Sequence, residues 1–278
     1  MALLLSMSQK PATALTIGGS DSGGAAGIQA DLKTWTVLGV YGMSAITAVT
    51  AQNSAAVAAI QYLPPSLVVA QMNAVLSDYG AGIIKTGFLG QAALIQAIAE
   101  SLIEAAAAPL VVDPVLVNHK GEAMFAPAAA AAYAQHLLPQ ALLATPNWRE
   151  AALLAGLPAE ALSEESGVLT AADQLHEQGA AHVLVTGWPA GTEIIDWWSD
   201  GHDLRPLAQE RIATVNTHGS GDTLSAAICA YLCRGLSLPE AIRHGRAFTA
   251  TALRAGAAWR LGAGHGPLAH FTSPEEAA

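Results

Sequence analysis

The residues best suited to chemistry lie in one glycine-rich segment, residues 216–225, NTHGSGDTLS. An apolar stretch at residues 212–215 precedes it, and a long apolar stretch that predicts a helix follows it. Gly219, Ser220 and Gly221 could present backbone N–H groups at the start of this helix, where the helix dipole also favours an anion. Asp222 could then take a proton from an alcohol while these groups bind a phosphoryl group. The alternative for Asp222 is an ordinary acidic residue that stabilises the helix dipole.

Two further carboxylates could hold a divalent cation near such a site. Asp113 follows a short apolar stretch at residues 110–112, and Glu150 lies three residues after Asn147, at the start of another predicted helix. An acidic protein that transfers phosphoryl groups needs a cation between the charges, and Mg²⁺ prefers one or two carboxylates plus water. The alternative for Asn147 and Glu150 is a capping box. The local sequence leaves both interpretations open.

A second glycine-rich segment, residues 14–31, predicts a strand, a turn and the start of a helix. It partly matches a dinucleotide-binding fingerprint, but Ser22 stands where the first glycine should be. No Asp or Glu lies between Asp31 and Asp78, so the acidic residue that would hold a ribose is missing. The sequence therefore disfavours a Rossmann dehydrogenase and favours the floor of a small-molecule pocket, because glycines allow close approach of the backbone.

The elements that must position these residues alternate between strands and helices. Strands are predicted at residues 14–17, 44–51, 83–86, 110–112, 142–145 and 183–186. Helices are predicted at residues 24–38, 66–79, 91–106, 127–138, 148–155, 170–178, 222–234 and 239–255. This alternation predicts an α/β fold with a mostly parallel sheet that is covered on both faces. We expect one domain over residues 1–278, with a frayed start at 1–12 and a tail at 262–278.

Polar residues follow each of the six predicted strands. They are residues 18–24, Gln52 and Asn53, residues 85–87, Asp113 and Pro114, residues 145–147, and Thr186 and Gly187. Each group alone could be only a turn. Because ligands bind at the carboxyl ends of strands in open α/β sheets, the six groups together indicate one binding site.

Composition limits the partners and the compartment. The net charge of −10 repels a phosphate backbone and anionic lipid, so we expect no nucleic-acid and no membrane partner. No clean run of about 20 apolar residues is present. The first ten residues carry no A-x-A cleavage pattern after an apolar run, so we expect no signal peptide. The two cysteines, Cys229 and Cys233, are too few for a disulfide framework. We therefore expect a cytoplasmic protein with a small-molecule substrate.

Several motifs resemble the hydroxymethylpyrimidine/phosphomethylpyrimidine kinases of thiamine biosynthesis, which belong to the ribokinase-like superfamily. The resemblance covers residues 14–255 and rests on GGSDSGGAAGIQADLK, MSAITAVTAQN, KTGFLG, VVDPV, TPNWREA and NTHGSGDTLSAA. The first two motifs are specific to the pyrimidine kinases, whereas GSGD and the N-x-x-E pattern mark only the superfamily. The resemblance implies a three-layer α/β/α fold and ATP as phosphoryl donor with Mg²⁺.

The resemblance also implies roles for individual residues. Gln52 would contact the polar edge of an aminopyrimidine ring, and Phe88 stands where a methionine usually packs on that ring. The full set comprises Gly19, Asp31, Gln52, Phe88 and Val115 for the substrate, Asn147, Thr186, Gly187 and His218 for ATP, Asp113 and Glu150 for the metal, Gly219, Ser220 and Gly221 as anion hole, and Asp222 as base.

Three positions depart from the family pattern. Asp222 replaces a cysteine, Thr186 replaces a lysine near the nucleotide, and His119, with Lys120 beside it, replaces a lysine in a flap after the DPV motif. A fixed carboxylate repels a dianionic phosphomonoester more than a neutral thiol does. We therefore expect faster phosphorylation of the alcohol than of its monophosphate.

The sequence thus predicts a kinase that phosphorylates 4-amino-5-hydroxymethyl-2-methylpyrimidine and its monophosphate. One alternative is a pyridoxal kinase, because pyridoxal is also a flat hydroxymethylated heteroaromatic ring and Asp222 is typical of classical pyridoxal kinases. A second alternative is a pyrimidine-binding protein without catalytic activity. Since related folds often pair subunits, we expect a homodimer.

Overall fold

A single twisted sheet forms the centre of the protein, in a computed structural model that describes residues 10–105, 108–118 and 120–271. Its strands in the described part of the chain run in the order β3-β2-β1-β4-β5-β6-β7-β8-β9. Their bounds are β1 (Thr13–Asp21), β2 (Tyr41–Gln52), β3 (Val57–Tyr62), β4 (Ile83–Thr86), β5 (Leu110–Val112), β6 (Ala141–Ala144), β7 (Val183–Ala190), β8 (Glu193–Ser199) and β9 (Leu204–Glu210). The six central strands pair in parallel, in the order β2, β1, β4, β5, β6 and β7. At the two sides of the sheet, β3 pairs antiparallel with β2, and β8 pairs antiparallel with β7 and β9.

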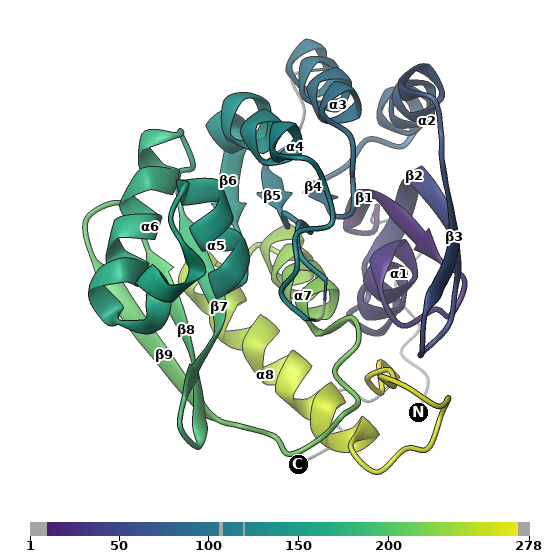
Figure 1. The fold of residues 1–278 in the computed structure, drawn as a ribbon. Helices are drawn as coiled ribbons and strands as arrows, with labels where there is room; N and C mark the ends of the chain where they lie inside the picture. The colour runs from purple at the N-terminus through teal and green to yellow at the C-terminus, as the bar shows by residue number, and fades with distance from the viewer. Residues whose placement is uncertain (1–9, 106–107, 119, 272–278) are drawn as a thin grey trace.

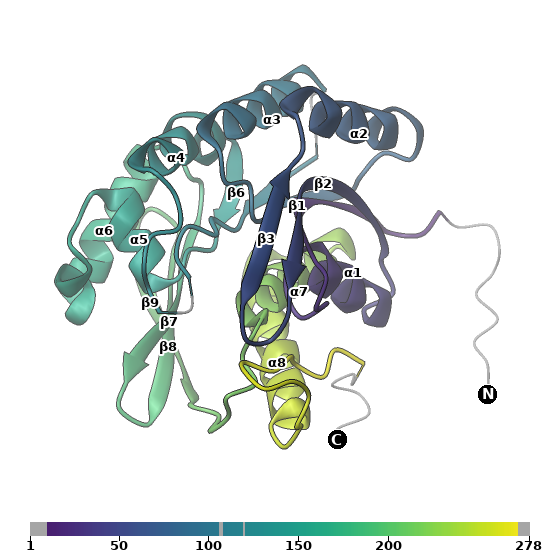
Figure 2. The same cartoon turned by 45° about the vertical axis from the view of Figure 1, so that its right-hand side comes forward.

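Helices cover both faces of this sheet, as Figures 1 and 2 show. The helices α2 to α6 lie on one face, and α1, α7 and α8 lie on the other. Their bounds are α1 (Gly27–Val37), α2 (Pro65–Asp78), α3 (Ala92–Glu104), α4 (Pro127–Ala132), α5 (Trp148–Ala155), α6 (Glu165–Glu177), α7 (Ser220–Cys233) and α8 (Leu238–Gly256). A π-helical stretch (Tyr133–Leu137) extends α4, and short 3₁₀ turns cover Leu138–Gln140 and Ala159–Ser163. The three-layer α/β/α arrangement confirms the predicted fold class.

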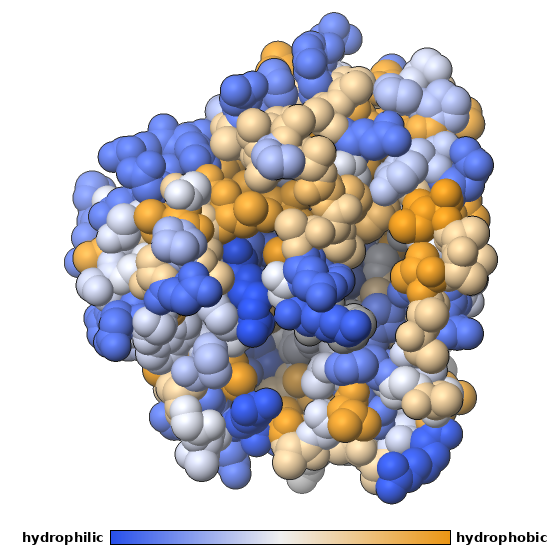
Figure 3. All heavy atoms as spheres, viewed as in Figure 1, coloured by the Kyte–Doolittle hydropathy of each residue, from blue (hydrophilic) through white to orange (hydrophobic). Residues whose placement is uncertain are grey.

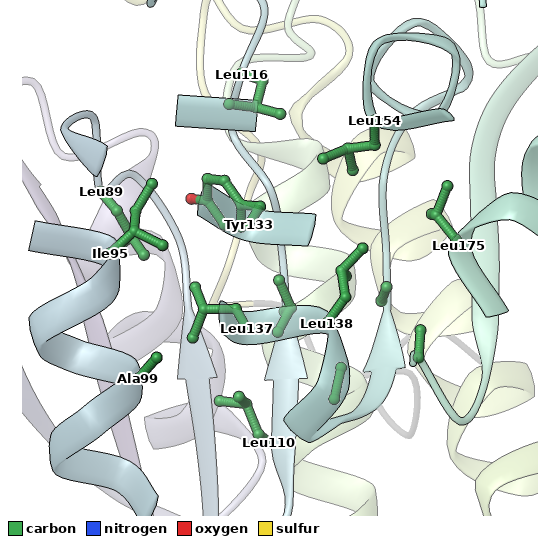
Figure 4. Packing of buried hydrophobic residues seen from close by; sticks show 14 of the residues in the cluster. Leu89, Ile95, Ala99, Leu110, Leu116, Tyr133, Leu137, Leu138, Leu154 and Leu175 are labelled. Atoms are coloured by element: carbon green, nitrogen blue, oxygen red, sulfur yellow. The ribbon is translucent and has the colours of Figure 1, made fainter. Parts of the chain in front are cut away.

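Alternating side chains of the central strands supply two separate apolar cores. On β4, Ile84 packs under α2 to α6, whereas its neighbour Ile83 packs toward α1, α7 and α8. Successive residues of a strand point to opposite faces, so a continuous apolar run serves both layers. Figure 4 shows part of the larger core, in which Leu137 lies between Leu110 of β5 and Tyr133 in the view. These two cores hold the strand ends at fixed positions.

The eight predicted helices and six predicted strands are all present, with shifts of a few residues at their ends. The six predicted strands do not include β3, β8 and β9, which pair antiparallel; β3 and β9 are the two edges of the sheet, and β8 lies between β7 and β9. The apolar stretch at residues 212–215 forms no strand. In the described residues, no helix has the length and apolar character needed to cross a membrane.

The C-terminal segment differs from the expected tail as far as the structure describes it. Residues 268–270 are buried, and Pro267 pairs with His218 in an isolated parallel bridge. The N–H of His218 also donates to the carbonyl oxygen of Gly266 at 3.1 Å. The segment thus packs beside the glycine-rich loop before α7. Residues 1–9 of the expected frayed start lie outside the described residues.

Candidate active site

The ends of β4 and β5 meet the first turns of α7. Nζ of Lys85, near the end of β4, lies 3.2 Å from Oδ1 of Asp222. The hydroxyl of Ser225 donates to Oδ2 of Asp113, just past β5, at 2.7 Å. Figure 3, in the view of Figure 1, shows a hollow in the middle of this face with hydrophilic side chains around it. The structure therefore brings the predicted base and one predicted metal ligand to the same helix start.

Gly219 is required at the start of α7 for two reasons. Its φ of +83° belongs to the left-handed region that residues with a Cβ rarely adopt. A Cβ built at Gly219 would also lie 1.9 Å from the carbonyl oxygen of Ala25. The loop before α7 therefore packs directly against the glycine-rich loop after β1, and only glycine allows that approach.

Gly219, Ser220 and Gly221 were predicted to offer N–H groups to an anion, but in the structure these N–H groups are not all free. The N–H of Ser220 donates to the carbonyl oxygen of Thr217 at 3.1 Å, so it is already engaged. Within the described ranges, the N–H groups of Gly219, Gly221 and Asp222 have no hydrogen-bond partner. Free N–H groups at a helix start bind anions. The candidate anion site thus consists of Gly219, Gly221 and Asp222, with Ser220 as part of the turn.

Lys85 connects three aspartates beneath this helix start. Its fully buried ammonium group lies 2.7 Å from Oδ1 of Asp31, 3.2 Å from Asp222 and 3.6 Å from Oδ2 of Asp113. The Thr16 hydroxyl donates to the second oxygen of Asp31 at 2.6 Å. The side chain of Asp31 is 1 % exposed, so it offers no surface to a substrate. We expected Asp31 to contact the substrate; in the structure its carboxylate is instead a buried partner of Lys85.

The charges in this cluster change the pKa values of its members. Burial raises the pKa of Asp31 and of Asp113, although the charge of Lys85 opposes the rise in both. Burial alone would lower the pKa of Lys85, but Asp31, Asp222 and Asp113 outweigh it and raise that pKa. Lys85 therefore remains charged among more carboxylates than it can neutralise.

Asn147 and Glu150 form the capping box that was the alternative to a phosphate and metal site. Oδ1 of Asn147 accepts from the N–H of Glu150 at 3.1 Å, and Oε2 of Glu150 accepts from the N–H of Asn147 at 3.0 Å. Oε1 of Glu150 accepts from the N–H groups of Leu116 and Val117. Burial, with Asp113 adding to it, raises the pKa of Glu150 to about 8. The Glu150 carboxylate is thus buried and accepts from three N–H groups within the protein.

Asp21, which the sequence analysis did not select, organises the loop after β1. Its carboxylate accepts from the N–H groups of Gly23, Ala25 and Ala26 at 2.8–2.9 Å. Burial tends to raise the pKa of Asp21, but His218 and these N–H groups lower it to about 2. The loop N–H groups therefore hold Asp21 itself, and the glycines allow the tight turn.

Gln52 and His218 lie together beside this loop. Nε2 of Gln52 lies 2.9 Å from Nε2 of His218, and that ring nitrogen lies 3.7 Å from Oδ2 of Asp21. We expected Gln52 at the substrate and His218 at the nucleotide. In the structure His218 forms a hydrogen bond with Gln52, the last residue of β2.

The aromatic side of the expected substrate pocket contains Phe88 and Gly19. A Cβ at Gly19 would lie 3.0 Å from Cδ1 of Phe88, so the absence of a side chain makes room for the ring. Phe88 stacks on Tyr62 at a centroid distance of 6.2 Å and contacts Phe125 edge-on at 5.2 Å. Val115 is half-buried two residues after Asp113. Phe88 thus lies in a cluster of aromatic rings, the kind of side chain that stacks on a flat ring.

Two of the residues expected at the nucleotide, Thr186 and Gly187, lie in the middle of β7, where its pairing with β8 shifts register. Thr186 pairs with Asn147 in an isolated parallel bridge, which brings these two residues together. The N–H of Gly187 donates to Oδ1 of Asp196 at 2.8 Å, and Nε of Arg246 donates to Oδ2 of Asp196 at 2.7 Å. The N–H of Gly187 is therefore engaged within the protein. In the predicted flap, Val117 pairs with Ala123, Lys120 is exposed, and His119 lies outside the described residues.

In the described ranges, no three His, Cys, Asp or Glu side chains form a ready metal site. Lys85 and Asp21 are the important residues that the sequence analysis left without a role. For Lys85 a signal existed, because it is a single charge in the otherwise uncharged strand IIKT. Asp21 gave no such signal among the other polar residues of its loop.

Comparison with known proteins agrees with this fold. The pyridoxal kinase from Staphylococcus aureus, solved in complex with ADP, superposes with a TM-score of 0.85 and 35 % identity over 93 % of each chain. The protein therefore has the ribokinase-like kinase fold. Residues 21–269 match the family model described as phosphomethylpyrimidine kinase, and the chain belongs to that family.

Two relatives extend this result. The hydroxymethylpyrimidine/phosphomethylpyrimidine kinase of Rhizobium meliloti is 45 % identical over 261 residues, which cover 94 % of this chain and 97 % of that protein. The structure of phosphomethylpyrimidine kinase from Clostridium difficile has a TM-score of 0.77 and 32 % identity, over 87 % of this chain and 99 % of that one. The similarity thus extends over nearly the whole of both proteins.

Proposed function

We propose that this chain transfers the γ-phosphoryl group of ATP to the hydroxymethyl group of 4-amino-5-hydroxymethyl-2-methylpyrimidine, and also phosphorylates the monophosphate, in thiamine diphosphate biosynthesis. One observation carries the proposal: the Asp222 carboxylate lies at a helix start whose Gly219, Gly221 and Asp222 N–H groups have no partner in the described ranges. Membership of the phosphomethylpyrimidine kinase family supports it.

In this proposal, each group at the helix start has a separate task. Asp222 accepts the proton of the substrate hydroxyl as the oxygen attacks phosphorus. The N–H groups of Gly219 and Gly221 donate hydrogen bonds to the oxygens of the transferring phosphoryl group, with the dipole of α7 adding to their effect. Gln52 and Phe88 hold the pyrimidine ring so that its hydroxymethyl group faces Asp222.

Mg²⁺ is part of the proposal because this acidic protein needs a cation to offset the charge of ATP. Among the predicted metal ligands, Asp113 fits better than Glu150. The described partners of Asp113 reach only its Oδ2, whereas both oxygens of Glu150 have donors. Glu150 would therefore act on the metal only through water, and Asn147 and Thr186 would lie near the nucleotide.

Pyridoxal is the second candidate substrate. The Staphylococcus aureus relative is a pyridoxal kinase, and its similarity covers 93 % of this chain. Pyridoxal is also flat and aromatic and carries a hydroxymethyl group, so the ring contacts of Phe88 would suit it. Classical pyridoxal kinases also carry an aspartate at the position of Asp222.

The experiment that tests the proposal is a steady-state assay of ADP release with ATP and Mg²⁺. The three acceptors are the pyrimidine alcohol, its monophosphate and pyridoxal. We expect the highest kcat/KM for the pyrimidine alcohol. A higher kcat/KM for pyridoxal would reverse the two candidates. Calorimetry that detects heat with the pyrimidine but none with ATP would instead favour a binding protein without catalytic activity.

The compartment and the assembly state are also proposals. We propose a cytoplasmic homodimer. The edge strand β3 and its neighbour β2 carry exposed apolar side chains, Val49, Val57 and Ile60, which support association with a second copy. Sedimentation velocity of the purified protein tests the dimer, since a monomer at micromolar concentration would contradict it.

A further inference from the structure

Lys85 is a charged residue buried in the middle of the sheet, and its burial has to be compensated. Lys85 lies in β4 after Ile83 and Ile84, and its side chain is 0 % exposed. Removing an ammonium group from water is costly unless charges and hydrogen bonds replace the water. A buried lysine is therefore retained only where its neighbours compensate it, and these neighbours indicate its task.

The contacts of Lys85 form a short chain that ends at Asp222. Its closest partner, Asp31 of α1, is held in turn by the hydroxyl of Thr16 at 2.6 Å. The indole N–H of Trp35, one turn further along α1, donates to the carbonyl oxygen of Ala226 in α7 at 2.9 Å. Lys85 is thus fixed by a strand and a helix that are themselves attached to the helix carrying Asp222.

The two oxygens of Asp222 are not equivalent. Oδ1 lies 3.2 Å from Nζ of Lys85, and in the described part of the chain no hydrogen bond or ion pair reaches Oδ2. The Asp222 side chain is 13 % exposed, whereas Lys85 and Asp31 are buried. One oxygen is therefore anchored inside the protein, and the other has no described partner.

We infer that Lys85 is a positioning residue for the phosphoryl transfer: it anchors Oδ1 of Asp222 and leaves Oδ2 as the oxygen that accepts the proton of the substrate hydroxyl. This inference rests on the proposed function, in which Asp222 is the base. Lys85 does not touch the substrate. Its effect is to fix the orientation of the carboxylate, on which proton transfer depends.

The alternative to this positioning role is a purely structural one, in which Lys85 only neutralises the charge of Asp31. In that case, replacing both residues by neutral side chains would leave the enzyme active. The double variant Lys85→Met/Asp31→Asn removes one charge of each sign, so the net charge of the cluster is unchanged, and the introduced amide oxygen can still accept from the hydroxyl of Thr16. It is the variant that separates the two roles.

The test compares this double variant with Lys85→Met and with a matched control. Ser237→Ala removes the capping box of α8, at the opposite end of α7 from Asp222, and lowers stability without touching the site. For each variant, Tm, kcat and both KM values are measured on the pyrimidine alcohol. We expect Ser237→Ala to lower Tm and to keep the kcat of the wild type.

Lys85→Met should lower both Tm and kcat, because it leaves Asp31 buried without its partner. In the double variant we expect Tm to recover while kcat stays at least about tenfold below that of the wild type, with KM changed by less than about threefold. If Lys85→Met does not fold, the double variant alone carries the test. Recovery of kcat together with Tm would overturn the inference.

A double-mutant cycle with Asp222→Asn gives an independent result. If Lys85 acts through Asp222, adding Lys85→Met/Asp31→Asn to Asp222→Asn should lower kcat by less than about twofold further. A further loss of tenfold or more would contradict this. An inactive wild type would refute the proposed function itself, which is a different outcome from an active wild type with an active double variant.

Discussion

Replacing Gly219 with alanine should weaken the folded state and the anion site together. A residue with a Cβ at a φ of +83° costs about 1–2 kcal/mol in backbone strain. The new Cβ would lie 1.9 Å from the carbonyl oxygen of Ala25, so the loop before α7 must move away by about 1 Å. A displacement of that size at a catalytic site costs on the order of 10²-fold in rate. We therefore expect kcat/KM for the pyrimidine alcohol to fall by about that factor.

Gly235→Ala is the matched control for this prediction. Gly235 has a φ of +89°, and no described atom lies within 4 Å of a Cβ built there. This variant should lose only about 1–2 kcal/mol of stability, from backbone strain, and keep its activity. Urea unfolding measures the stability of both variants, and the ADP-release assay measures their activity. The reasoning is refuted if Gly219→Ala is as active and as stable as Gly235→Ala.

Two further predictions concern charge. Asp222→Cys should raise the ratio of kcat/KM for the monophosphate to that for the alcohol, because a neutral thiol repels a dianionic substrate less; an unchanged ratio in the ADP-release assay would argue against this repulsion. Asp21→Asn should destabilise the protein at neutral pH by about 1–2 kcal/mol, since the pKa of Asp21 in the folded protein is about 2, below its ordinary value of 3.8. The stabilisation from Asp21 is complete above about pH 5 and is lost as the pH falls through about 2. Urea unfolding of wild type and variant between pH 2 and pH 7 should therefore converge at the acid end.

The central strands and the helices could be predicted because their signals are local. Apolar runs such as residues 110–112 are buried on both faces, and Asn147 with Glu150 carries a complete capping box within four residues. The edge strands β3 and β9 were missed because they lack such runs. In β9, Pro206 interrupts the strand pattern, and β3 is exposed along most of its length.

The anion loop could also be predicted locally, but the support of the site could not. Lys85 is 54 residues from Asp31 and 137 residues from Asp222, so only the packing of β4 against α1 and α7 joins them. The same holds for His218, which is next to the anion loop in sequence but contacts Gln52, 166 residues away. Sequence spacing identified residues with chemical potential, whereas their partners depended on the folded sheet.

The most direct measurement for the central claim is single-turnover phosphoryl transfer from ATP to the pyrimidine alcohol by wild type and Asp222→Asn. Asparagine keeps the size of the side chain and an oxygen that can accept from Lys85, but it cannot take up the proton. We predict a loss of about 10²–10⁴-fold in the rate of transfer, with folding and ATP binding unchanged. A loss of less than tenfold would contradict the assignment of Asp222 as the base.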